Sequence, residues 1–236
     1  YTVTSGVFLN STTTVTTDTS TLMLTPYNVT LDSTSTCLWA NGDSGGSVKS
    51  IKTGKTVNIG GRDVRIRPDT GDIDTVTRQT QFGRNRDDWG HWFGCNNSNP
   101  MYQFVLEDAY QRRNPHIAGV APRVDVPEVA GNAPIFAISP LLERFNDFHT
   151  ANRFTSACSA MIYRDDLFGA AFAGNAFICE PVHNLVHREV VTQAGLLFRS
   201  RRADDEQQSE FLASTDPWFR PTTVKTGPDG ALWIAD

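Results

Sequence analysis

The chain has 236 residues, 39% hydrophobic and 20% charged, which is enough for one domain with a packed core or for a piece of a larger protein. Its 21 Lys and Arg residues face 26 Asp and Glu residues, giving a formal net charge of −5. Because the basic residues are scattered rather than gathered in a stripe, we expect no nucleic-acid partner.

We also expect no transmembrane segment. The most apolar stretch, Leu167 to Cys179, is too short to span a bilayer and is interrupted by Gly169, Gly174 and Asn175. The chain starts at Tyr1 without a basic-then-apolar leader, so a signal peptide has been removed or the chain is an excised piece. The compartment therefore has to be inferred indirectly.

The first 38 residues differ in texture from the rest. They are rich in Thr, contain no Lys or Arg, and alternate in places, as in Thr12 to Thr16. Such a pattern predicts an exposed or edge β segment, or a linker. We therefore divide the chain into a Thr-rich β extension, residues 1–38, and a main domain, residues 39–236.

The main domain reads as a series of short β-like runs. No window sustains an apolar helical pattern for three turns, and the only modest helical candidates are residues 140–148 and 201–212. An Asp, a nearby Gly and then an apolar strand recur, at Pro68 to Gly71, Asp87 to Phe93 and Gly227 to Asp236. These tight turns predict an all-β fold, and their spacing favours a β-propeller with four-stranded blades of about 40–45 residues.

Four cysteines are present, with neither a C-x-x-C pair nor a His in zinc-finger spacing. Cys158 and Cys179 flank a segment with the pattern of a strand pair, so we expect a Cys158–Cys179 disulfide if the compartment is oxidising. The alternative is two free buried thiols.

Several stretches together resemble the propeller of the bacterial membrane-bound dehydrogenase family that is associated with haem-binding domains and related to glucose/sorbosone dehydrogenase-like propellers. They run in the family's order over residues 41–236: Asn41 to Gly46, Gly61 to Asp63, Arg67 to Gly71, Gln81 to Arg84, Asp88 to Gly90, Asn97 to Pro100, Arg113 to His116, Cys179 to Arg188, and Phe219 to Asp236. The Thr-rich start does not match, and no C-x-x-C-H haem motif is present.

The resemblance implies an extracytoplasmic propeller, periplasmic or at the cell surface, that acts on a sugar or alcohol with a quinone (PQQ) and Ca²⁺. Residues 41–236 supply about four to five blades, fewer than the closed propeller of the related dehydrogenases. We therefore expect a partial propeller whose open strand edges are covered or paired with another chain.

The resemblance also implies cofactor-binding residues. Arg84 and Asn85 resemble the Arg-Asn pair that holds the quinone carboxylates in soluble quinoprotein sugar dehydrogenases, and a guanidinium suits a carboxylate because it donates two parallel hydrogen bonds. Arg153 is a further anchor for cofactor or substrate. The alternative for Arg84 is an ion pair with a neighbouring Asp at a blade edge.

A dehydrogenase further needs a base and a metal. His149 lies in the most polar loop, Asn146 to Arg153, and is the expected base for the substrate hydroxyl proton. Asp87 and Asp88 are the expected Ca²⁺ ligands. The alternatives are histidines hydrogen-bonded between blades and Asp side chains that cap turns.

Two functions follow from these patterns. The first is a sugar or alcohol dehydrogenase, which requires His149, Arg84 and Arg153 to converge in one cavity. The second is a non-catalytic carbohydrate-binding or structural module that forms oligomers or filaments through exposed β-edges. Trp89 and Trp92 are expected to pack between blades; the alternative is that they offer stacking faces for a sugar ring.

Overall fold

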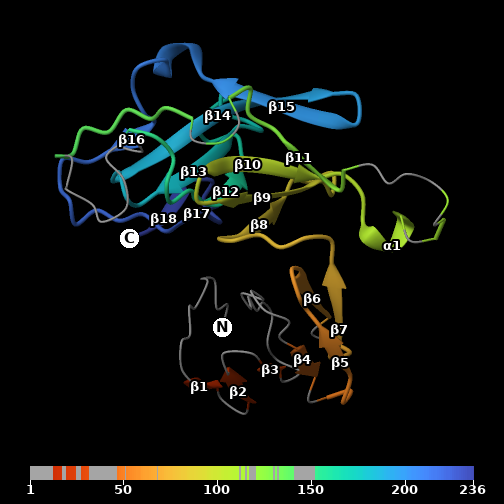
Figure 1. Cartoon of the computed structure of the whole chain (residues 1–236). Coiled ribbons are helices and arrows are strands. Elements are labelled where there is room, and N and C mark those ends of the chain that lie inside the picture. Colours follow the sequence, from red (N-terminus) through yellow and green to blue (C-terminus); the bar gives the residue numbers. More distant parts are fainter. Residues whose placement is uncertain are drawn as a thin grey trace. The chain divides into compact units, whose positions relative to one another are not determined.

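The computed structural model describes residues 13–17, 20–24, 28–31, 47–50, 52–67, 69–111, 113, 114, 116, 121–129, 131, 133–140 and 152–236. Contacts within the chain divide it into two units. The first unit comprises residues 1–80 and 106–122, and the second comprises residues 81–105 and 123–236. The predicted boundary between residues 38 and 39 lies outside the described residues. Figure 1 labels the strands of both units.

The first unit contains a five-stranded sheet, a separate hairpin and one short helix. The sheet has the order β1-β2-β3-β4-β5, in which only the β3–β4 pair is parallel. The hairpin is β6–β7. The elements are β1 (Thr13–Thr17), β2 (Ser20–Leu24), β3 (Asn28–Leu31), β4 (Ser47–Ser50), β5 (Thr56–Asn58), β6 (Asp63–Arg67), β7 (Asp72–Val76) and α1 (Asp108–Gln111).

Two acidic side chains hold the end of this hairpin. Asp63 is buried and accepts hydrogen bonds from the backbone N–H and the hydroxyl of Thr80, at 2.9 and 3.0 Å. Glu107 accepts from the backbone N–H and the hydroxyl of Thr77, at 3.0 and 2.7 Å. The second pair ties residues 106–122 to the rest of the unit, although 30 residues separate the two partners.

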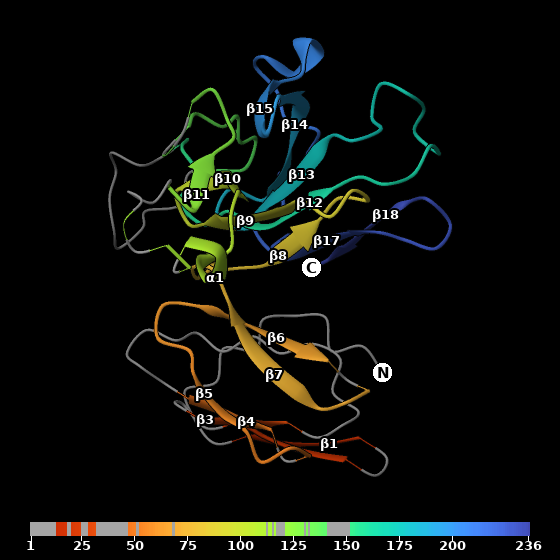
Figure 2. The ribbon, with the colours of Figure 1, turned by 90° about the vertical axis from the view of Figure 1, so that its right-hand side faces the viewer.

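The second unit contains two four-stranded antiparallel meanders and a hairpin. The meanders have the orders β11-β10-β9-β8 and β12-β13-β14-β15, and β16 adds to β14 of the second. The hairpin is β17–β18, and Figure 2 shows it beside β12 and β13. The strands are β8 (Arg84–Arg86), β9 (Trp92–Asn96), β10 (Asn99–Phe104), β11 (Arg123–Asp125), β12 (Cys158–Ile162), β13 (Ala176–Glu180), β14 (Leu185–Ala194), β15 (Leu197–Arg202), β16 (Leu212–Ala213), β17 (Thr223–Thr226) and β18 (Leu232–Ala235).

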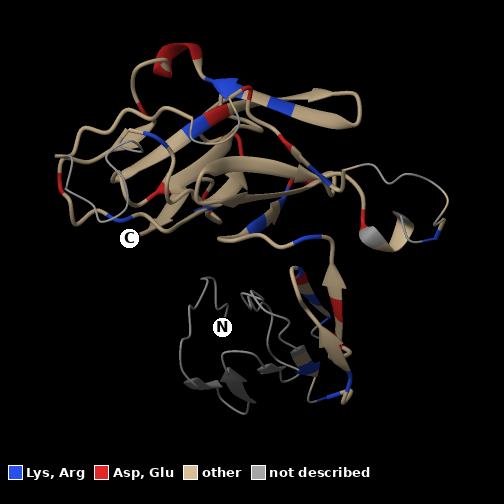
Figure 3. Cartoon of the chain, in the orientation of Figure 1, with Lys and Arg blue, Asp and Glu red and all other residues tan. Residues whose placement is uncertain are grey.

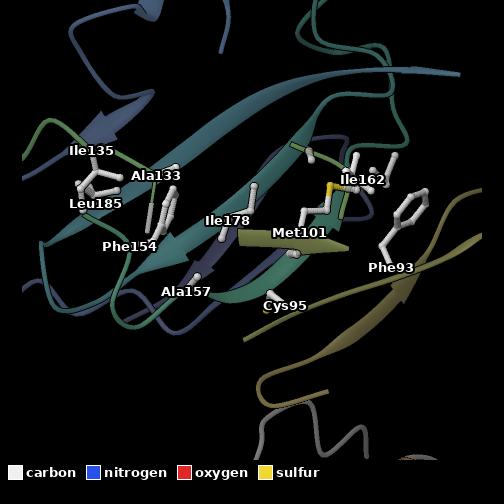
Figure 4. Packing of buried hydrophobic residues seen from close by; sticks show 13 residues of the cluster. Phe93, Cys95, Met101, Ala133, Ile135, Phe154, Ala157, Ile162, Ile178 and Leu185 are labelled. Atoms are coloured by element: carbon white, nitrogen blue, oxygen red, sulfur yellow. The ribbon is translucent and has the colours of Figure 1, made fainter. Parts of the chain in front are cut away.

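Two hydrophobic clusters cover the two faces of the β12–β13 pair. The first cluster packs β9 and β10 against one face, and Figure 4 shows its side chains, among them Phe93, Met101 and Ile178. The second cluster packs the β17–β18 hairpin against the other face, with Phe177 and Val224 buried there. Because both faces are covered, every residue of β12 and β13 is buried, and all of them are apolar except Ser159 and Glu180.

The structure confirms the all-β prediction, with several antiparallel sheets and α1 as a single four-residue turn. Tight turns with a glycine at positive φ, Gly71 and Gly230, join β6 to β7 and β17 to β18, as the Asp-Gly pattern predicts. The predicted helix over residues 201–212 is wrong, because β15 continues to Arg202 and only Asp204–Glu206 is helical. Among the described residues no closed barrel or propeller is formed. None of their helices is long and apolar enough to cross a membrane.

A β-bulge at Ser159 decides which way the side chains of β12 point. Cys158 pairs with Cys179 and Met161 with Phe177, so three residue steps on β12 match two on β13. Ser159 takes a left-handed φ of 56°. Its backbone N–H donates to Phe82 O at 2.7 Å, and its hydroxyl donates to the carbonyl and accepts from the N–H of Val224. Two neighbouring segments, one at Phe82 and one at Val224, therefore fix the bulge.

Replacing Ser159 tests this arrangement. Ser159→Ala leaves the buried N–H of Val224 without its acceptor, so we expect the free energy of unfolding to fall by about 1–3 kcal/mol. Ser159→Gly loses the same bonds but tolerates the positive φ, so its loss should be about 1 kcal/mol smaller. Denaturant unfolding of both variants measures the difference. A larger loss for Ser159→Gly than for Ser159→Ala contradicts this account of the bulge.

Candidate functional site

A groove in the second unit combines an exposed indole with several charged side chains. Its volume is about 640 Å³, and we call it the Trp89 groove. One side is formed by the turn after β8, residues Asp87 to Trp89, and the other by the segment after β12. Its lining residues are Asp87, Asp88, Trp89, Phe93, Ile162, Tyr163, Arg164, Asp165, Asp166, Ala173, Gly174, Val191, Gln193 and Phe198.

Asp87 builds the turn that presents the indole. Its Oδ1 accepts hydrogen bonds from the backbone N–H of Trp89 and of His91, at 3.0 and 2.8 Å. Its Oδ2 lies 2.6 Å from His91 Nδ1. This Asx turn holds the backbone of Trp89 at its tip, and the Trp89 residue is 86% exposed. A large aromatic group is thus held in solvent beside a groove.

Asp88 and Arg164 meet at the groove from two different sheets. Nε of Arg164 donates to Asp88 Oδ1 at 2.6 Å, and an Nη atom donates to the same oxygen. The bond to Asp88 raises the pKa of Arg164 above its usual value. Both side chains are about half exposed, so the pair adds at most about 1 kcal/mol to stability. Among the described residues Asp88 Oδ2 has no hydrogen bond, which leaves an acceptor at the groove.

The two predicted quinone anchors are engaged elsewhere. The guanidinium carbon of Arg84 lies 3.7 Å from the centroid of the Phe104 ring. Asn85 donates from Nδ2 to Ala160 O at 2.6 Å, and its Oδ1 accepts from Lys225 Nζ. Arg84 is thus stacked and both polar atoms of Asn85 are bonded within the fold, and their role as quinone anchors stays a prediction. Neither residue lines the Trp89 groove.

The predicted calcium ligands also form bonds within the fold. All the bonds of the Asp87 carboxylate go to its own turn, and Asp88 pairs with Arg164. Within the part of the chain that the structure describes, no three His, Cys, Asp or Glu side chains are grouped so as to hold a metal ion. Asp87 caps its own turn in the structure, which is the alternative role considered for these Asp side chains.

Arg153, the third predicted anchor, lines a second cavity of about 710 Å³. Pro134 to Ile138, Asn152 and Glu210 lie on its wall, whereas Arg84 and Asn85 do not. The predicted base His149 lies outside the described residues. The structure therefore does not bring Arg153 together with Arg84 and Asn85 in either cavity.

Behind the second cavity lies a buried ionic cluster that the sequence analysis missed. His187 Nδ1 is 2.6 Å from Glu210 Oε2, and His187 Nε2 is 2.9 Å from Glu189 Oε1. Arg202 donates to Glu210 Oε1 at 2.5 Å. Figure 3 shows acidic and basic residues side by side along β14. The i, i+2 spacing of His187 and Glu189 on one strand face was the available signal.

The cluster sets the charges of its members. Burial alone lowers the pKa of His187, but the bonds to Glu189 and Glu210 outweigh burial and raise this pKa to about 9. Burial likewise raises the pKa of Glu210, and the bonds to His187 and Arg202 outweigh it and lower the pKa below its ordinary value. Both oxygens of Glu210 are thereby occupied, so it is not poised as a general base.

We predict a pH-dependent stability from this cluster. The folded pKa of His187 is raised from 6.5 to about 9, so its contribution is fully present below pH 6.5 and is lost as the pH rises through 9. The contribution is of the order of 3 kcal/mol. Glu189→Gln removes one of the two carboxylates bonded to His187, so it should lower the free energy of unfolding relative to the unaltered protein. This difference between the two proteins should become smaller as the pH rises across this window. Denaturant unfolding against pH measures it, with the exposed Glu128→Gln as control. A pH-independent loss would refute the assignment.

Comparison with known families places most of the chain in one of them. The model of a family described as a domain of unknown function (DUF7133) matches residues 16–236. The chain belongs to this DUF7133 family. It has no match among curated proteins and none among solved structures. The DUF7133 match spans both structural units and carries no assigned activity. The resemblance to the membrane-bound dehydrogenases stays a prediction beside it.

Proposed function

We propose that this domain binds carbohydrate in the Trp89 groove. The observation that carries the proposal is the 86% exposed Trp89 at the rim of a groove with polar side chains. Unlike a single exposed side chain on an open surface, an indole beside a groove offers a large rigid apolar face next to polar groups, which together can hold a ligand. A sugar ring presents one apolar face that stacks on such an indole while its hydroxyls remain available for hydrogen bonds.

The polar pair beside Trp89 complements these hydroxyls. Asp88 Oδ2 is available to accept a hydrogen bond from a ligand, and the Arg164 guanidinium supplies N–H donors next to it. A sugar hydroxyl both donates and accepts, so two adjacent hydroxyls are matched by one carboxylate and one guanidinium. Because Asp88 and Arg164 are hydrogen-bonded to each other, their positions are set before the ligand arrives, which lowers the entropy cost of binding.

The charges of the groove favour neutral over acidic sugars. Asp88 is balanced by Arg164, whereas Asp165 and Asp166 add carboxylates to the same lining. The carboxylate of a uronic acid would meet like charges there, which costs affinity. We therefore infer that the ligand is a neutral glycan or polyol.

The arrangement of the sheets supports a second part of the proposal, which concerns the fold and the location of the protein. Two consecutive four-stranded antiparallel meanders, followed by a two-stranded hairpin, have the strand pattern of propeller blades. We infer that the second unit is a partial β-propeller, and that the protein works outside the cytoplasm, where glycans of a cell surface are available.

Replacing Trp89 tests the groove. Trp89→Ala should weaken binding of neutral oligosaccharides by about tenfold or more, about 1.4 kcal/mol, because the stacking face is lost. Trp218→Ala is the matched control, because Trp218 is 85% exposed and donates its backbone N–H to Asp216 Oδ1 in the same kind of Asx turn. Glycan arrays and titration calorimetry measure the affinities, with uronate oligomers for comparison. Equal losses in both variants, or stronger binding of uronates, would sink the proposal.

A second candidate function is the oxidation of a sugar or alcohol that the resemblance implies. One observation that motivates it is Arg153 in the wall of the 710 Å³ cavity, although Arg84 and Asn85 lie outside that cavity. A bound quinone would supply the oxidising capacity, while Arg153 would orient the substrate and His149 would take up its hydroxyl proton.

Adding PQQ and Ca²⁺ to the purified protein tests this second function. We expect sugar-dependent reduction of an electron-accepting dye that is lost in Arg153→Ala and His149→Ala, because these residues would hold and deprotonate the substrate. Arg199→Ala, in β15, serves as the control substitution. Dye reduction that survives both site substitutions, or none in the unaltered protein, contradicts the dehydrogenase assignment.

A further inference from the structure

Two cysteines lie directly opposite one another across the central strand pair of the second unit. Cys158 of β12 is the register partner of Cys179 of β13. The two side chains belong to the same hydrophobic cluster, where Cys158 Sγ donates to Pro221 O at 3.9 Å. Opposed residues of an antiparallel pair have Cα atoms about 4.5–5.5 Å apart, which is within the range that a disulfide spans.

The bulge at Ser159 creates this juxtaposition. On a regular strand, Cys158 would share a face with Ala160 and Ile162, which belong to the other cluster. The extra residue moves Cys158 to the face of Met161, where Cys179 also points. The same hydrogen bonds that fix the bulge therefore fix the pairing of the two thiols.

The bulge also excludes Cys95 as the partner. Cys95 of β9 lies in the cluster on the opposite face of the β12–β13 pair, and its Sγ donates to Phe82 O at 3.5 Å. The sheet itself stands between Cys95 and the side on which Cys158 and Cys179 meet. Burial raises the pKa of Cys95 to about 12, so this thiol stays protonated. The fourth cysteine, Cys37, lies outside the described residues.

We propose that Cys158 and Cys179 are a modification site at which the protein acquires a disulfide as it folds. Both are thiols in the structure. In the reaction one Cys thiolate attacks the disulfide of a small-molecule or protein oxidant and forms a mixed disulfide, releasing one oxidant thiol; the second Cys thiolate then attacks the protein sulfur of the mixed disulfide and releases the second oxidant thiol. The two cysteines lose two protons and two electrons, one S–S bond forms, and the oxidant's disulfide becomes two thiols. The inference does not depend on the groove or its ligand.

The native burial of the pair sets the time of the reaction. Cys158 is 6% exposed and Cys179 is fully buried. The bond to Cys179, together with burial, raises the pKa of Cys158 well above its usual range, so the reactive thiolate is scarce in the folded protein. Oxidation therefore precedes the final docking of the β17–β18 hairpin. Once buried, the disulfide resists reducing agents until the protein unfolds.

Peptide mapping tests the pairing directly. The whole chain is refolded with reduced and oxidised glutathione, denatured, alkylated and digested without reductant. We expect a Cys158–Cys179 cross-linked peptide and an alkylated Cys95. Alkylation of both Cys158 and Cys179 after oxidative refolding, or a cross-link that contains Cys95, would overturn the inference.

The melting temperatures of the same protein after oxidative and after reducing refolding give a second test. The difference between them does not depend on how stable each variant is by itself. The disulfide closes a loop of about 20 residues, so the unaltered protein should melt about 5–10 °C higher after oxidative than after reducing refolding. Cys158→Ala and Cys179→Ala should each abolish this difference, whatever their own melting temperatures. Cys95→Ala, a matched buried thiol, should keep it. A difference that persists in Cys158→Ala refutes the proposed bond.

Discussion

The hydrogen bonds around Ser159 are the constraint on which the second unit depends. They hold a residue in the left-handed region, where a non-glycine side chain costs about 1–2 kcal/mol, and so the surroundings must over-determine it. In return they join three segments: the loop before β8, the start of β12, and β17. Without the extra residue of the bulge, the two faces of β12 would be exchanged. Met161 would then point into the cluster that now contains Ile162, and Ile162 into the cluster that now contains Met161.

The groove inherits its geometry from this strand. Tyr163 and Arg164 follow β12 directly, so the orientation that the bulge imposes continues into the residue that reaches Asp88. The facing side comes from another meander, where Asp87 shapes the turn that carries Trp89. The candidate site is therefore a junction between two sheets, each contributing one turn. Its polar contacts are exposed and weak in terms of stability, which suits groups that a ligand has to reach.

Sequence patterns predicted the local features of this fold well and the distant ones poorly. The Asp-Gly turns and the strand pair between Cys158 and Cys179 depend on neighbouring residues, and the structure has both. The bulge depends on Phe82 and Val224, which no local pattern connects to Ser159. Residues 201–212 are charged enough for a helix, yet pairing of β15 with β14 overrides that preference.

The candidate site shows the same limit. Asp87, Asp88 and Trp89 were identified from sequence, because a turn with exposed polar and aromatic groups is visible there. Arg164 was not, because 76 residues separate it from Asp88. Arg84 and Asn85 matched a motif whose chemistry depends on where the side chains point. In this fold they point into packing contacts with Phe104 and Ala160.

The interleaving of the two units along the chain has a consequence for synthesis and for engineering. Residues 106–122 belong to the first unit although β8, β9 and β10 of the second precede them. During synthesis, the hydrogen bonds between Thr77 and Glu107 can therefore form only after three strands of the other unit have been made. Neither unit is encoded by a single contiguous stretch of sequence. Cutting the chain after residue 80 therefore separates residues 1–80 of the first unit from residues 106–122 of the same unit.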